Sequence, residues 1–125
     1  MPDEIILSSL PKTWILDLDG TLLKHNGYLL DGKDTLLHSI ENLFQNISNE
    51  DMVIIVTSRK SQYAAETENF LHRNQIRYDH IIYDAPLGER ILINDRKPSG
   101  LNMAFAINTK RDIATDVRFL IDSSL

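Results

Sequence analysis

Apolar residues of this chain fall into two kinds of run that alternate along the sequence. Short continuous runs are typical of strands buried within a sheet. Such runs lie at residues 12–17, 52–56, 78–83, 90–93 and 101–107, and each predicts a strand. For residues 1–10 we expect only a weakly defined lead-in.

Apolar residues at helical spacing occupy the segments between these strands. They recur every three or four positions from Asp34 to Ile47, and Asp34 is a candidate N-cap. Ser61 is a candidate cap for a second helix, and residues 110–122 predict a third. Two turn signals, at residues 26–27 and 31–32, predict a hairpin-like flap over about residues 21–32.

Strands that alternate with helices indicate a parallel sheet covered by helices. The chain shows no internal repeat, low-complexity tract or linker. We therefore expect one domain over residues 1–125, a three-layer Rossmannoid α/β fold with helices on both faces of a parallel sheet.

Composition and charge narrow the class of protein. The chain has 125 residues, of which 42% are hydrophobic and 25% charged, as in ordinary globular proteins. It has no cysteine, which excludes a thiolate metal site and a cysteine nucleophile and fits a reducing, cytoplasmic location. Neither a basic leader nor a membrane-length apolar run is seen. The formal net charge of −5 and the lack of a basic patch argue against a nucleic-acid partner.

Two carboxylates follow the first predicted strand. Asp17 and Asp19 are two residues apart, so in an extended chain their side chains point the same way. The carboxyl ends of strands are where open α/β sheets bind ligands. Adjacent carboxylates repel each other unless a cation relieves them, and Mg²⁺ prefers such hard oxygen ligands. Asp19-Gly20 could also be a simple turn.

The segment DLDGT at residues 17–21 resembles the signature of the haloacid dehalogenase superfamily of phosphohydrolases. Two further motif positions of that family have matches in this chain. Thr57 follows the second core strand in MVIIVTSR, and Asp95 follows the predicted strand at residues 90–93 in RILINDRKP. The resemblance covers roughly residues 14–97 and implies a capless core, because neither insertion point leaves room for a cap domain.

This resemblance implies roles for individual residues. Asp17 would be the nucleophile that forms an aspartyl-phosphate, and Asp19 the general acid and then the base. Magnesium would be held by the carboxylates of Asp17 and Asp95 and by the backbone carbonyl of Asp19. Thr57 and Ser58 would bind the phosphate oxygens, although both residues could instead cap a helix.

One residue of the family pattern, a lysine, is missing. Ala85 stands where a lysine usually precedes a proline, so a cation must come from elsewhere. We take Lys97 as the replacement, with Arg59 and Arg90 as competitors, and we include Arg59 among the phosphate-binding residues. Each of these side chains could equally be a solvated surface charge.

The implied substrate is a small phosphorylated metabolite. RILINDRKP in so short a chain resembles hydrolases of surface-sugar biosynthesis, which favours a sugar phosphate. An open site would accept an extended substrate or borrow a lid from a neighbouring subunit of a homo-oligomer. His25 and Tyr28 in the flap could touch the substrate or be solvated. No membrane partner is expected.

Three alternatives remain beside a magnesium-dependent phosphatase. A mutase would transfer the phosphoryl group to a substrate rather than to water. A phosphoacceptor signalling domain would carry similar acids at its strand ends. A catalytically degenerate phosphate-binding module is suggested by Ala85.

Overall fold

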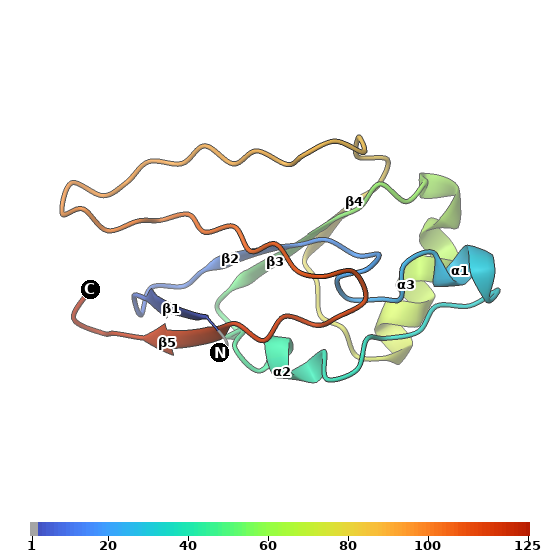
Figure 1. Cartoon of the computed structure of the whole chain (residues 1–125), viewed down its shortest axis with the longest axis horizontal. Helices are drawn as coiled ribbons and strands as arrows, with labels where there is room; N and C mark the ends of the chain where they lie inside the picture. The colour runs from blue at the N-terminus through green and yellow to red at the C-terminus, as the bar shows by residue number, and fades with distance from the viewer. Residues whose placement is uncertain (1–2) are drawn as a thin grey trace.

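The computed structural model describes residues 3–125 as a mixed α/β arrangement with two small parallel sheets (Figure 1). Its strands are β1 (Glu4–Leu7), β2 (Thr13–Leu16), β3 (Met52–Val56), β4 (His80–Ile82) and β5 (Arg118–Ile121). Its helices are α1 (Gly27–Leu30), α2 (Glu41–Phe44) and α3 (Ala64–Arg73), with a 3₁₀ turn, η1 (Ser61–Tyr63), before α3. Over the described residues, every helix is too short or too polar to cross a bilayer.

The central sheet has the order β2-β3-β4, and all three strands are parallel. In its register Leu16 pairs with Ile55, which pairs with Ile81. The predicted strands at 12–17, 52–56 and 78–83 are confirmed in type; the strand at 52–56 has the predicted bounds, and the other two are shortened. Because β2 and β3 are adjacent and parallel, the residues that follow them lie at the same edge of the sheet.

The buried core lies on one face of this sheet. Leu16, Val53 and Ile55 point into it and pack with Leu71 of α3, and all four are at most 8% exposed. On the opposite face Ile15 and Ile82 are each 52% exposed. The α/β class is therefore confirmed, whereas the predicted cover of helices on both faces is not.

The second sheet corrects the expectations for both ends of the chain. β1 lies within the predicted lead-in and pairs in parallel with β5, which lies within the predicted helix at 110–122. Apolar residues in RFLI suit a strand as well as a helix, and pairing with β1 decides for the strand. The Phe119 ring meets the Trp14 ring edge-on at 5.0 Å, which joins the two sheets.

The helix predicted from Asp34 to Ile47 is reduced to α2. Ser39 has a φ of 65°, which a right-handed helix cannot contain, and α2 begins only after it. The predicted N-cap at Asp34 is wrong, because its carboxylate accepts hydrogen bonds from Arg59. The flap at 21–32 holds α1 and a β-bridge from Leu23 to Leu36 in place of a regular hairpin.

A long excursion, which we call the arm, spans residues 88–110. It leaves the carboxyl end of β4, runs out and returns, as the gold and orange trace in Figure 1 shows. The strands predicted at 90–93 and 101–107 are wrong, because among residues 3–125 no neighbouring strand supplies partners for their backbone groups. A turn at the tip is held by Gly100 N–H donating to Lys97 O over 2.8 Å.

Candidate functional site

Asp17 directly follows β2 and keeps an accessible carboxylate. The Thr21 hydroxyl donates to one carboxylate oxygen over 2.9 Å, and Arg90 Nη1 donates to the other over 2.8 Å. The Asp17 side chain is 38% exposed. The Asp17 carboxylate is thus oriented by a hydroxyl and a guanidinium at the carboxyl end of a parallel strand. In this position it can contact a small anionic ligand that enters from solvent.

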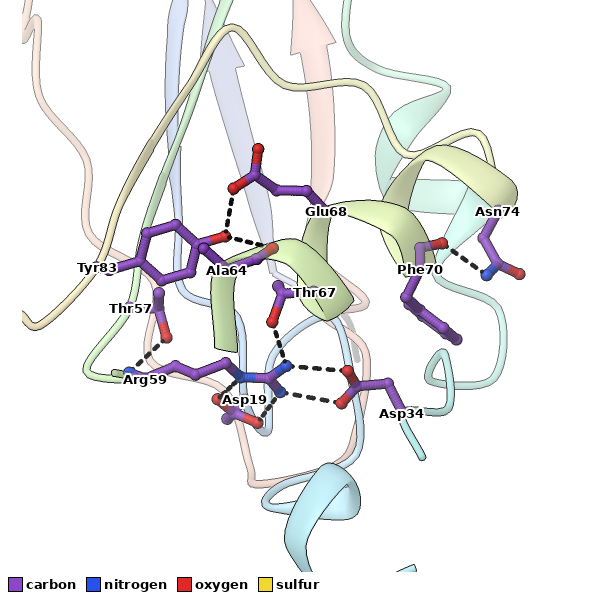
Figure 2. Close-up of polar contacts among 10 residues, drawn as sticks. All are labelled: Asp19, Asp34, Thr57, Arg59, Ala64, Thr67, Glu68, Phe70, Asn74 and Tyr83. Carbon is purple, nitrogen blue, oxygen red and sulfur yellow. Dashed lines mark hydrogen bonds and ion pairs between the residues drawn. The ribbon is translucent and has the colours of Figure 1, made fainter. Parts of the chain in front are cut away.

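Arg59, three residues after β3, forms a buried network beside it (Figure 2). Its Nη2 and Nε donate to the two carboxylate oxygens of Asp19 over 2.7 and 3.3 Å. Its Nη1 and Nη2 donate to those of Asp34 over 2.9 and 3.0 Å. The Thr67 hydroxyl of α3 accepts a further bond from Nη1 over 2.9 Å.

Electrostatics hold this guanidinium in its charged form. Burial alone would lower the pKa of Arg59, but the hydrogen bonds and charges of Asp34 and Asp19 outweigh burial and raise it. The Tyr28 ring lies 3.8 Å from the guanidinium carbon, a cation–π contact. Burial and the charge of Asp19 raise the pKa of Tyr28, so its phenol stays neutral near pH 7.

The Arg59 network connects four parts of the fold. Arg59 itself follows β3, and Asp19 belongs to the turn after β2. Asp34 follows the flap, and Thr67 belongs to α3. The sequence predicted that Asp17 and Asp19 project together onto one cation. In the structure each carboxylate has its own guanidinium, Arg90 for Asp17 and Arg59 for Asp19.

The Thr57 hydroxyl and the Ser58 backbone amide are the groups expected to bind phosphate, and the side-chain hydroxyls of both residues make internal hydrogen bonds. Thr57 is 1% exposed, and its Oγ1 accepts from the backbone N–H of Arg59 over 3.0 Å. Ser58 Oγ donates to Pro86 O over 3.3 Å. Ala85, which stands where the family pattern has a lysine, donates its N–H to Thr57 O over 3.0 Å. In this conformation the loop after β4 is thus tied to the residues after β3.

Lys97 and Asp95 lie in the arm and are exposed. Lys97 belongs to the turn at the tip, and the cation beside Asp17 is Arg90 instead. Within residues 3–125 no three Asp, Glu, His or Cys side chains gather in a way that could hold a metal ion. The structure therefore does not bring Asp95 into a common acidic cluster with Asp17 and Asp19.

Sequence reasoning missed Asp34 and Thr67 as partners of Arg59. The only signal was indirect: an arginine between an apolar strand and an amphipathic helix requires counter-charges. Nothing in the spacing identified Asp34, which is 25 residues away. A similar long-range pair joins Tyr83 and Glu68 at 3.0 Å, and burial together with that hydrogen bond raises the pKa of Tyr83 (Figure 2).

A hollow on the surface does not coincide with these residues. It encloses about 710 Å³ between α2 and the chain that leads into β5, and Asp112 to Leu120 form one wall. Asp17, Asp19 and Arg59 do not line it. A ligand site at the open carboxyl end of a strand need not be deep, so the candidate site remains at Asp17.

The chain was compared with known protein families, with curated proteins and with solved structures, and none of the three comparisons finds a match. Its resemblance to haloacid dehalogenases therefore depends on the motif residues themselves.

Proposed function

We propose that this chain is a phosphatase of the haloacid dehalogenase type, a cytoplasmic enzyme that hydrolyses a small phosphate monoester such as a sugar phosphate. The observation that carries the proposal is the Asp17 carboxylate, accessible at the end of β2 and paired with Arg90 at 2.8 Å. The DLDGT motif supports the same role for Asp17. The three-layer core implied by the motif belongs to the proposal as well.

The proposed reaction has two steps. An Asp17 oxygen attacks phosphorus, the ester P–O bond breaks, and the leaving oxygen takes the electron pair and a proton. Water then attacks the aspartyl-phosphate, the bond from phosphorus to the Asp17 oxygen breaks, and inorganic phosphate leaves. Asp19 would supply the first proton and accept one from water, using lone pairs that Arg59 leaves free.

Arg90 is our candidate for the cation that replaces the missing lysine. Its guanidinium already contacts Asp17, and it could stay in place while a phosphate enters, because it offers several donors. Phosphoryl transfer depends mainly on positioning and on neutralising the oxygens of the phosphoryl group. We therefore expect Arg90→Gln to lower kcat/KM at least tenfold and Lys97→Gln to lower it less, with exposed Arg73→Gln as the control.

A magnesium requirement remains a prediction of the family resemblance. The acidic side chains as arranged do not fit the ion, because Asp95 is in the arm and both oxygens of Asp17 have protein partners. We assign no step to magnesium for that reason. The activity assay tests the requirement directly, by adding magnesium and then chelating it.

The decisive experiment measures release of inorganic phosphate from an aryl phosphate and a panel of sugar phosphates. We expect steady turnover that Asp17→Asn abolishes and that exposed Asp116→Asn leaves unchanged. Absence of turnover in the unmodified chain, with and without magnesium, would overturn the proposal. So would full activity of Asp17→Asn.

A second candidate function is a phosphoacceptor or a degenerate phosphate-binding module. This alternative is favoured because buried Arg59 donates hydrogen bonds to both carboxylate oxygens of Asp19. Asp19 is the residue expected to act as general acid and base. Such a module would accept a phosphoryl group on Asp17 once and hold it. Incubation with acetyl phosphate would then give one phosphate per chain, absent in Asp17→Asn, without continued release.

A further inference from the structure

The arm, residues 88–110, is largely exposed. Residues 88–100 are exposed without exception. The backbone bonds recorded within the arm close only its tip, at Lys97, Gly100 and Leu101. In the described structure its two limbs therefore leave most of their backbone donors and acceptors to solvent, as unpaired edge strands do.

The side chains of the arm are unusually apolar for such an exposed segment. Ile91 is 83% exposed and Ile93 is 91% exposed. Four more large apolar residues of the arm are at least 38% exposed: Leu92, Met103, Phe105 and Ile107. Soluble monomeric proteins rarely expose so many apolar side chains together, and such a surface is typical of an interaction site.

A complementary apolar surface lies on the central sheet, on the side opposite the core. We call it the open face, and it comprises Ile15, Ile54, Val56 and Ile82. These residues are neighbours, because Ile15 pairs with Ile54 and Val56 with Ile82 in the register. All four are β-branched aliphatic residues outside the buried core cluster. The open face thus offers a flat apolar platform.

Charge makes the arm complementary to the rest of the same chain. The arm contains four of the chain's 13 Lys and Arg residues but only two of its 18 Asp and Glu residues. Its formal net charge is therefore +2, and that of the remainder is −7. An arm would be attracted to the body of another copy without any further partner.

We propose that two copies of this chain associate by exchanging arms, so that the arm of each copy covers the open face of the other. Such an exchange is reciprocal and closes a two-fold dimer. A standard interface buries about 800 Å² per partner. Each copy would contribute the six apolar side chains of its arm together with its open face. A second copy is favoured over the arm's own sheet, because within a single chain the arm leaves Ile91 and Ile93 exposed.

The first test is the mass of the full chain in solution by sedimentation velocity. We expect twice the chain mass of 14.3 kDa at micromolar concentration, and dissociation as salt is raised. Ile91→Asp with Ile93→Asp should raise the dimer dissociation constant at least tenfold. Leu29→Asp with Leu30→Asp, which are also exposed but lie on α1, should not. A monomer at every concentration would overturn the proposal.

A second test does not depend on how the aspartate variants fold. The chain has no cysteine, so Ile93→Cys and Ile82→Cys each introduce a single thiol. Mixing the two single variants under mild oxidation should give a disulfide-linked heterodimer faster than either variant forms a homodimer. Equal rates for all three pairings would contradict arm exchange. In a chain carrying both cysteines, a link within one monomer would show instead that the arm folds onto its own sheet.

Discussion

At the scale of single residues, Arg59 and Arg90 divide the two site aspartates between them. Arg59 is 3% exposed and all its side-chain contacts lie inside the fold, whereas Arg90 is exposed. The sequence assigned Arg59 to phosphate binding. Its burial points instead to a positioning role, in which it holds Asp19 and fastens the flap through Asp34.

We predict that Arg59→Met destabilises the fold by about 3–5 kcal/mol, because it leaves two poorly solvated carboxylates without a partner. Arg59→Met combined with Asp34→Asn should cost less than the sum of the two single changes. Urea unfolding of the three variants measures this coupling.

In the phosphatase assay, Arg59→Lys should lower kcat more than it raises KM, whereas a phosphate-binding arginine would mainly raise KM.

At the scale of elements, the sequence predicted best where burial alone decides. Continuous apolar runs gave β2, β3 and β4, because strands of a parallel sheet are apolar throughout. Helical spacing gave α3 but overextended α2, since the left-handed backbone at Ser39 has no sequence signature. RFLI was assigned to a helix because its partner strand β1 is more than 100 residues away.

The same limit applies to the candidate site. Asp17 and its neighbours were found from a local motif, whose spacing is visible in the sequence. Arg90 was named only as a competitor of Lys97, and Asp34 was not named as a partner of Arg59, because side-chain pairing between distant segments depends on how the chain folds. Loops carry such pairs without any periodic pattern.

The loop before β3 carries a buried acid that should make stability depend on pH. Asp51 is 6% exposed and accepts hydrogen bonds from Lys12 N–H, Ser48 N–H and Trp14 Nε1, each over 2.9 Å. Burial raises the pKa of Asp51, but these bonds outweigh burial and lower it below the usual 3.8. The ionised acid thus fastens the start of β2 to the loop before β3.

We predict that Asp51→Asn lowers the free energy of unfolding by about 1–3 kcal/mol at pH 7. A carboxyl whose pKa is lowered by folding stabilises the fold above its unfolded pKa, near 4, and the contribution disappears as pH falls through the folded value. The difference between the two proteins should therefore shrink below pH 4. Urea unfolding from pH 7 to 3 measures it, with exposed Glu50→Gln as the control. A constant difference across that range would contradict the assignment.

At the scale of the whole molecule, the two sheets are joined by few side chains. The β1–β5 sheet reaches the main core through the contact of Phe119 with Trp14, supported by partly buried Ala114. Trp14 is the single tryptophan of the chain and also bonds to Asp51. Its fluorescence therefore reports on the junction between the sheets, while circular dichroism reports on all of the regular structure.

This junction predicts how cooperatively the chain unfolds. In the unmodified protein, fluorescence and circular dichroism should follow one urea transition, because the edge-to-face ring pair couples the sheets. Phe119→Ala should lower stability by about 2 kcal/mol, less than for a fully buried ring, because Phe119 is only half-buried. It should also separate the two transitions, since β5 can then leave before the core. Leu30→Ala, exposed on α1 and outside the arm, is the control. Coincident transitions in Phe119→Ala would mean that backbone pairing couples the sheets without this contact.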